Sequence, residues 1–234
     1  MRFSKIGSLG LLHAVEPHRD WIVKSNVVRI DVVSTQAPPT PKGQRTRERI
    51  VQAAAELVAE KGAVAMSLDD VGSRAPASRS QLYHYFENKA ALIRAVVNAT
   101  SDAILGAQDE LLLGVADWSG IERWMDALVA IQVERQARGG CPLGSLAGQL
   151  AERDPEARAA LAEGLGRWQD SIRGGLEALQ ARGQLRAEAD PAALAAATIA
   201  LIQGGLLLTQ VRRDPQQLRS ALDAGLTLLH AQAT

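Results

Sequence analysis

The chain has 234 residues but only one cysteine and few aromatic side chains, which make up 3% of the sequence. A single cysteine excludes an internal disulfide and fits a reducing compartment, so we expect a cytoplasmic protein. The spacing of the histidines is not that of metal ligands. These histidines are His13, His18, His84 and His230. We therefore expect no metal ion and no cofactor.

Signals of an enzyme and of a β-sheet are also missing. Residues 144–148 read Gly-Ser-Leu-Ala-Gly, which is not the G-x-S-x-G turn of a serine nucleophile, and no strand-like segment precedes them. Residues 27–33 could form a strand, but no second strand is available to pair with it. The sequence thus predicts an all-α protein that is not an enzyme.

One segment is long and apolar enough to raise the question of a membrane. Residues 191–211 carry no charge over 21 positions. However, alanine dominates the first half, and Gln203, Gln210 and the pair Gly204-Gly205 interrupt the rest. We interpret the segment as a helix buried on all sides in a protein core, and we expect no membrane partner.

The net charge is zero, but the charges are unevenly distributed. Residues 40–94 hold nine Lys or Arg against six Asp or Glu, whereas residues 95–234 hold twelve against seventeen. A basic segment beside an acidic remainder indicates that the basic segment is the part that meets nucleic acid.

Two helix starts and a turn lie close together between residues 67 and 89. Ser67 with Asp70, and Ser78 with Gln81, each have the spacing of a capping box, in which the two residues exchange hydrogen bonds at a helix N-terminus. Pro76 cannot continue the first helix. The pattern predicts a helix over residues 68–75, a short turn and a second helix from residue 79, which is the layout of a helix-turn-helix.

The second of these helices has an apolar and a polar face. Leu82 and Phe86 lie four residues apart and can face a core. The residues that then point outward are Arg79, Ser80, Tyr83 and His84. Such side chains hydrogen-bond to bases and phosphates, so the sequence predicts a DNA-reading helix.

A longer motif runs through the same segment. Its Leu-Tyr-x-x-Phe pattern, followed by Asn and Lys, stands at Leu82, Tyr83, Phe86, Asn88 and Lys89. In this motif the chain resembles the DNA-binding domain of the TetR family of bacterial transcriptional regulators, over about residues 42–97. The family usually has glycine where this chain has Pro76, and proline disfavours a positive φ. Either the turn here keeps a negative φ, or the angle between the two helices differs.

The resemblance implies a homodimer that binds a palindromic operator in double-stranded DNA and responds to a small-molecule effector. At the matching positions it implies that Arg79 and Tyr83 contact base edges. The phosphate contacts that it implies are Ser67, Gln81, Tyr85 and Lys89. Further candidate DNA contacts are Arg45, Ser78, Ser80 and His84.

Periodicity and capping residues predict about nine helices in three regions. We expect residues 1–39 to be a disordered N-terminal extension, 40–88 a helix-turn-helix DNA-binding domain, and 89–234 a helical effector-binding and dimerisation domain. The first helix is expected over residues 44–61, with Gly62 as its left-handed stop. Beyond the helix-turn-helix, helices are expected over residues 89–110, 121–138, 145–151, 155–181, 191–211 and 215–232.

A single helix-turn-helix reads too few base pairs, so the chain should dimerise. We expect the interface at the helices over 191–211 and 215–232, because two helices from each chain form a four-helix bundle. The second helix carries a leucine stripe, whose alternative role is packing within the chain. Its members are Leu218, Leu222, Leu226 and Leu229.

The middle of the chain is expected to enclose the effector, in a mostly apolar pocket. The candidates are large apolar residues together with the lone cysteine, and packing in the core is their alternative role. They are Trp118, Trp124, Met125, Leu128, Cys141 and Trp168.

Cys141 lies between Gly139-Gly140 and Pro142, at an expected break between helices. There its thiol could be accessible, and the amide end of a helix starting at Ser145 could lower its pKa. Residues 140–146 also resemble a stretch of a TetR subgroup that includes sensors of reactive electrophiles. Sensing and simple packing are both open for this cysteine.

From these observations we expect a DNA-binding transcriptional regulator, most simply a repressor that a small-molecule effector releases from its operator. The alternative is a helical protein-interaction module whose DNA-binding part is vestigial.

Overall fold

The computed structural model describes residues 40–113 and 117–234, and within them it has helices and no strand, so the predicted all-α class is confirmed. The expected extension over residues 1–39 lies outside the described residues. In chain order the helices are α2 (Pro41–Ala65), α3 (Leu68–Arg74), α4 (Arg79–Tyr85), α5 (Lys89–Leu113), α6 (Trp118–Glu134), α7 (Pro142–Leu150), α8 (Pro155–Ala181), α9 (Pro191–Arg212) and α10 (Gln216–His230).

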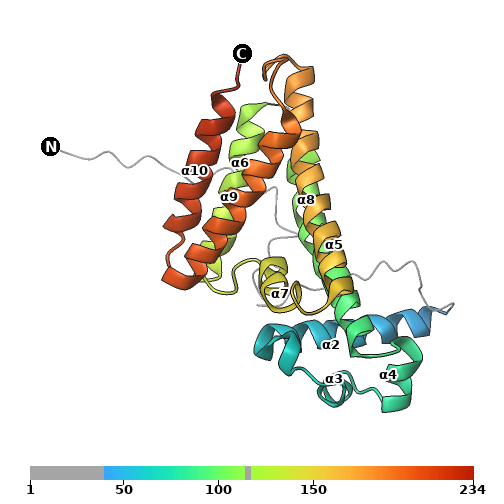
Figure 1. Ribbon diagram of the computed structural model, residues 1–234. Coiled ribbons are helices and arrows are strands. Elements are labelled where there is room, and N and C mark those ends of the chain that lie inside the picture. The colour runs from blue at the N-terminus through green and yellow to red at the C-terminus, as the bar shows by residue number, and fades with distance from the viewer. Residues whose placement is uncertain (1–39, 114–116) are drawn as a thin grey trace, which may run out of the picture.

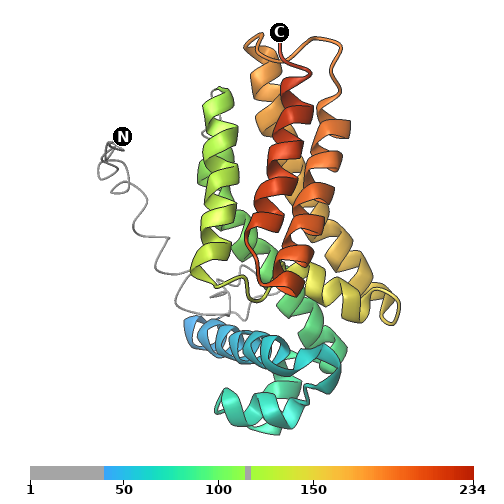
Figure 2. The ribbon, with the colours of Figure 1, turned by 90° about the vertical axis from the view of Figure 1, so that its left-hand side faces the viewer.

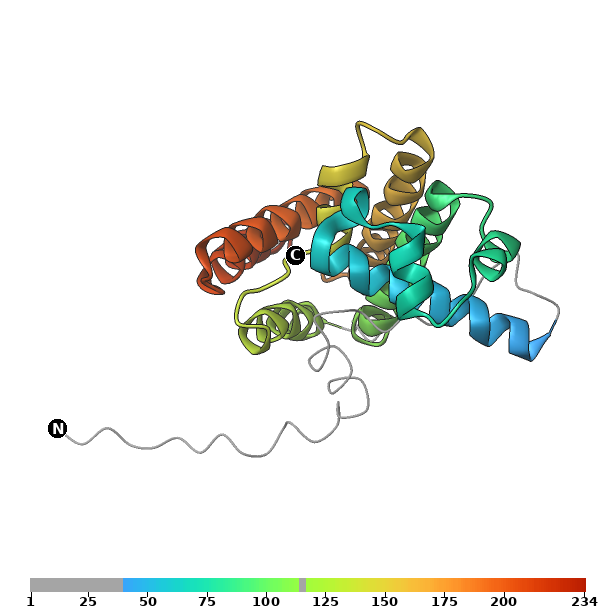
Figure 3. The same ribbon diagram turned by 90° about the horizontal axis from the view of Figure 1, so that it is seen from below.

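The helices form two groups, which we call the head (α2–α4) and the body (α5–α10). The head lies at one end of the molecule, and the long helices of the body stand on it as an upright bundle (Figures 1 and 2). Helix α5 begins beside the head helices and runs on through the body (Figure 1). The short helix α7 lies where the head and the body meet (Figure 1). Seen from below, the head lies in front of the body, and α9 and α10 extend to one side of it (Figure 3).

Helix α2 passes through a kink rather than stopping where we expected. Gly62 has φ 85° and ψ 157°, and one further helical turn follows to Ala65. The expected break at Gly62 is therefore confirmed, although the short helical turn after it extends α2 to Ala65. The amide of Ala63 donates to Gln149 Oε1 of α7 at 2.8 Å, which holds this last turn against the body.

Replacing Gly62 with alanine should destabilise the protein. A side chain disfavours this backbone region, and a Cβ would lie 2.8 Å from Gln149 Oε1. We expect the free energy of unfolding to fall by about 1–3 kcal/mol. Denaturant titration measures this loss, with Gly106→Ala as the control, since nothing lies within 4 Å of a Cβ there. Equal stability of the two variants would contradict the expectation.

The loop between α6 and α7 begins and ends earlier in the chain than the sequence suggested, and its backbone is more strained. We expected α6 to reach residue 138. It ends at Glu134, because Gln136 and Ala137 have φ values of 53° and 55°. The next helix begins at Pro142 rather than Ser145, since proline suits the first helical position. The loop between the two helices thus contains four left-handed residues, which are Gln136, Ala137, Gly139 and Gly140.

Asp-Pro pairs start the last three helices much as expected. Asp154 and Asp190 each cap a helix through two backbone amides and precede a proline at its start. The third pair differs in detail, because Pro215 occupies the N-cap while Asp214 Oδ1 accepts from Gln216 N at 3.0 Å.

Helix α9 is not buried on all sides, so that expectation is wrong. One face packs in the core through Leu194, Ile202 and Leu206, whereas Leu207 is 60% and Val211 71% exposed. Two helical segments are long and apolar enough to cross a membrane, Pro191–Arg212 and Lys89–Gln108. The buried share of the most apolar stretch is 33% in the first segment and 50% in the second.

The leucine stripe of α10 packs within the chain. Leu218, Leu222 and Leu229 are each no more than 1% exposed, and Leu226 is partly buried against the same core. Helices α9 and α10 come close enough that a Cβ at Gly205 would lie 2.9 Å from Leu218. The stripe therefore joins α10 to α9, and a large apolar residue of α10 that stays exposed is Leu228, at 41%.

Candidate DNA-binding surface and ligand cavity

Both capping boxes of the head are formed. Ser67 Oγ accepts from Asp70 N at 3.1 Å, and Asp70 Oδ2 accepts from Ser67 N at 2.9 Å. Ser78 and Gln81 make the same exchange at the start of α4, at 3.2 and 2.9 Å. Lys61 also donates to Asp70 at 2.5 Å, and the bonds from Lys61 and Ser67 hold the pKa of that carboxyl below its usual range. These bonds fix where each short helix begins.

The turn between α3 and α4 keeps a left-handed residue although that residue is proline. Pro76 has φ 24°, so of the two alternatives left open by the sequence the negative φ is wrong. The physical reason is the helix end, where Ala77 N donates to Gly72 O at 3.0 Å. This closing bond of a Schellman motif requires a left-handed conformation at the residue before Ala77.

Helix α4 presents the expected polar face. Leu82 and Phe86 are 2% and 5% exposed and anchor the helix in the core of the head. The exposed residues are Arg79, Ser80, Gln81, Tyr83 and His84, while Tyr85 is partly buried and its ring meets that of His84 edge to face. Helices α3 and α4 lie at the end of the head that is farther from the body (Figure 1).

Several basic residues near this face have partners inside the chain. Lys89 Nζ donates to Val64 O at 2.8 Å and so completes the end of α2. Arg49 Nε donates to Ala75 O at 2.9 Å, and the Arg47 guanidinium lies 5.2 Å from the centre of the Phe86 ring. Arg45 and Ser67 are exposed at the surface. Lys89 therefore has a structural role that the sequence did not reveal.

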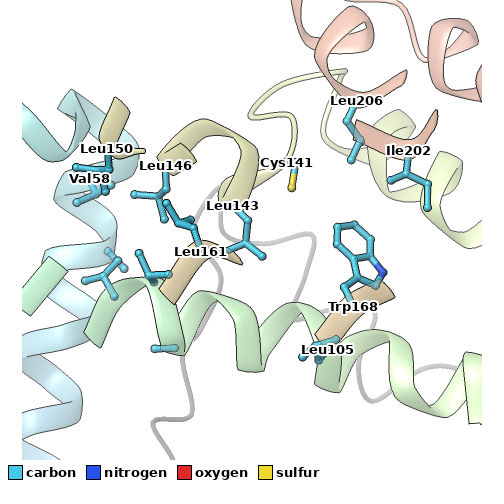
Figure 4. Packing of buried hydrophobic residues seen from close by; sticks show 14 of the residues in the cluster. Val58, Leu105, Cys141, Leu143, Leu146, Leu150, Leu161, Trp168, Ile202 and Leu206 are labelled. Carbon is cyan, nitrogen blue, oxygen red and sulfur yellow. The ribbon is translucent and has the colours of Figure 1, made fainter. Parts of the chain in front are cut away.

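The body contains a cavity of about 80 Å³, which we call the inner cavity. It lies between α5, α6, α8 and α9, and the start of α7 closes one side. Cys141, Trp168 and Leu206 reach it from three separate segments (Figure 4). Its polar lining residues are Gln108, Gln132, Arg135 and Cys141.

Three of the expected pocket residues line this cavity and three do not. Leu128, Cys141 and Trp168 line it. Trp118 is not among the lining residues, because it lies at the start of α6, where its ring stacks on that of His230 with 4.5 Å between the ring centres. Trp124 and Met125 are also not among the lining residues, because they are buried in the core at 1% and 2% exposure.

Gln108 organises the wall of the cavity, and sequence reasoning missed it. Its Oε1 accepts from the indole N–H groups of both Trp124 and Trp168, each at 3.0 Å. Gln108 is 7% exposed and both tryptophans are buried, so these bonds satisfy donors that are cut off from water. A glutamine on an expected apolar helix was the only signal, and its partners lie 16 and 60 residues away.

Cys141 is buried rather than accessible, with 7% of its side chain exposed. It caps α7, where its Sγ accepts from Gly144 N at 3.4 Å. Burial raises the pKa of the thiol and outweighs this amide, so the possibility of a lowered pKa is not borne out. The cysteine is therefore a neutral thiol in the wall of the inner cavity.

A second and larger hollow, of about 570 Å³, lies between the head and the body. It is lined by Val58 and Glu60 of α2, by Ser145 of α7, and by Arg138 and Arg213. None of the expected pocket residues contributes to it. Its volume depends on how the head sits against α7 and the end of α9.

Two family descriptions match the chain. Residues 50–96 match "Bacterial regulatory proteins, tetR family", and residues 119–224 match "Tetracyclin repressor-like, C-terminal domain". The first match includes α3, α4 and the start of α5, and the second runs from α6 into α10. The two matches thus cover the helix-turn-helix and most of the residues that line the inner cavity.

Individual relatives agree with these matches. An uncharacterized HTH-type transcriptional regulator of the lacX 3' region in Lactococcus lactis subsp. lactis is 29% identical over 77% of this chain and 91% of its own length. The transcriptional regulator AcuR of Cereibacter sphaeroides is 26% identical over 77% and 83%.

Solved structures show the same fold. The regulatory protein TetR from Rhodobacter sphaeroides has a TM-score of 0.68 and 26% identity, covering 79% of this chain and 98% of that structure. The reduced form of NemR from E. coli has a TM-score of 0.69 at 21% identity, covering 81% and 97%.

Proposed function

Since the chain belongs to the TetR family of bacterial transcriptional regulators, we propose that it represses transcription by binding an operator and releases that operator when a small molecule occupies the inner cavity. The observation that carries the first half is the α4 face. Five neighbouring polar residues are exposed there, on a helix whose start and core anchor are both fixed. Such a helix can enter the major groove with its base-reading side chains already placed.

We place the dimer interface on the exposed apolar face of α9 and α10. Leu207, Leu208, Val211 and Leu228 are between 41% and 71% exposed. Helices α9 and α10 lie side by side at one edge of the body (Figure 1), so a second copy could add its own pair to make a four-helix bundle. Such a dimer would hold the two α4 helices about 34–36 Å apart, one turn of DNA.

Helix α7 supports a route from the inner cavity to the head. Cys141 and Pro142, at its start, line the cavity, while Gln149 near its end accepts from Ala63 N of α2. A ligand that moves the start of α7 would therefore also move the end that holds the head. We propose that this shift changes the spacing of the two α4 helices and weakens operator binding.

The buried thiol favours a reversible ligand over an electrophile. A thiolate is the reactive form of cysteine, and burial raises the pKa of Cys141 above its usual value. At neutral pH the thiol stays protonated. We therefore propose that Cys141 contributes to the cavity wall and does not act as a sensor of electrophiles.

Replacing Arg79 with alanine should weaken operator binding and relax its sequence preference. Arginine commonly binds guanine through two hydrogen bonds, so we expect a loss of about 1–3 kcal/mol. Fluorescence anisotropy with DNA from the promoter beside the gene, at several salt concentrations, measures the loss. Arg158→Ala is the matched control, because Arg158 is exposed on α8 in the body.

The same titrations test the function itself. Wild-type protein should bind the promoter fragment more tightly than a shuffled sequence of the same length. Equal affinity for both, or equal affinity of the Arg79→Ala and Arg158→Ala variants for the promoter, would contradict the proposed reading surface. It would then favour a helical protein-interaction module with a vestigial head.

A further inference from the structure

The lining of the inner cavity combines one cation with an orphaned acceptor. Arg135 lines it at the end of α6, and burial lowers the pKa of its guanidinium. Gln132 lines it one helical turn earlier, is 3% exposed, and its Oε1 has no hydrogen-bond partner among the described residues. Buried acceptors are normally satisfied, so this atom marks a place for a ligand donor.

The charge around the cavity is of one sign. Among the described residues that line it there is no Asp or Glu, and the other titratable group is Cys141, a neutral thiol. Arginine stays protonated, and its guanidinium has several N–H donors, so it can bind a carboxylate in addition to the contacts that it makes within the chain. A ligand anion would add a charge-assisted hydrogen bond to those that the guanidinium already makes.

The size of the cavity limits the ligand. Its volume of about 80 Å³ is small beside the 300–1,000 Å³ or so of pockets for drug-sized molecules. Most of the remaining wall is apolar, with Leu128, Trp168 and Leu206 among its members. The occupant should therefore be compact, with a short hydrocarbon part.

We propose that the inner cavity binds a small organic acid, whose carboxylate pairs with Arg135 and whose hydroxyl or amine donates to Gln132 Oε1. This inference rests on the proposed function, because it names the chemical class of the effector. A ligand of about six non-hydrogen atoms gains at most about 1.5 kcal/mol per atom, so we expect a Kd in the micromolar to millimolar range.

Three small probes separate the two interactions. Racemic lactate has a carboxylate and a hydroxyl, propanoate has the carboxylate alone, and lactamide has the hydroxyl without the charge. Isothermal titration calorimetry on the full chain should give the tightest binding for lactate. Lactamide should bind at least tenfold more weakly, and propanoate should fall between the two. Equal binding of lactate and lactamide, or no binding of either acid at about 10 mM, would overturn the proposal.

Matched variants assign the interactions to residues. Arg135→Gln should abolish the preference for the acids over lactamide, whereas Arg138→Gln should keep it, because Arg138 lines the other hollow. Gln132→Leu should remove the advantage of lactate over propanoate and keep the preference for acids. Circular dichroism checks that each variant is folded. Arg135→Lys provides a second test, because it keeps the charge and should retain acid binding. Acid preference that survives Arg135→Gln would overturn the proposal.

Operator release separates this inference from the proposed function. Acids that bind the protein but leave the operator bound would support the ligand class and contradict the effector role. If other compounds release the operator while neither acid binds, the effector role would stand and the ligand class would fall.

Discussion

Replacing Val211 with glutamate should turn the dimer into monomers and abolish tight operator binding. Val211 is 71% exposed on α9, beside Leu207 and Leu208, where we place the partner subunit. Two-fold symmetry would bury the new carboxylate twice in an apolar interface, and an unpaired buried charge costs several kcal/mol. Losing the second reading head would reduce operator affinity by a factor of about 10²–10⁴.

The matched control for this variant is Val133→Glu. Val133 is also exposed, at 57%, but lies on α6, away from the proposed interface. Sedimentation velocity should show the Val211 variant as a monomer and the Val133 variant as a dimer. A Val211→Glu protein that stays dimeric and binds operator as tightly as wild type would place the interface elsewhere.

Replacing Gln108 with leucine should strongly destabilise the body. The change removes the acceptor of two indole N–H groups, those of Trp124 and Trp168, which are 1% and 2% exposed. Each unpaired buried donor costs about 1–3 kcal/mol, so the free energy of unfolding should fall by about 2–6 kcal/mol. Chemical denaturation followed by tryptophan fluorescence would measure this loss.

Gln216→Leu provides the comparison for Gln108→Leu, because Gln216 is exposed at the start of α10 and the substitution is the same. It should change stability by less than about 0.5 kcal/mol. If the two variants are equally stable, then the indole groups do not depend on Gln108. The shared acceptor would then have no part in holding α5, α6 and α8 together around the cavity.

The sequence by itself determined the head and the class of fold. The capping boxes at Ser67 and Ser78, and the spacing of Leu82 and Phe86, act over a few residues, so their outcome follows from local chemistry. The Asp-Pro pairs likewise placed the starts of the long helices within about a residue. These elements need little from the rest of the chain, and the prediction of nine helices was confirmed for the described residues.

Only the tertiary structure decided which apolar residues face the cavity, the core or the surface. The sequence does not distinguish the three tryptophans of the body. In the structure Trp118 lies beside His230, Trp124 lies in the core and Trp168 lines the cavity. The uncharged sequence of α9 did not indicate which of its faces is buried, because nearly all of its residues are apolar. Packing against α10 determined which face of α9 stayed exposed.

The same reason explains the residues that sequence reasoning missed. Gln108 meets its indole partners across 16 and 60 residues, and Lys89 reaches Val64 O across 25. Such bonds depend on how helices are placed against one another, which periodicity along one helix does not specify. Local chemistry therefore determined the DNA-reading unit, while contacts between distant helices determined the cavity and the link through α7 to the head.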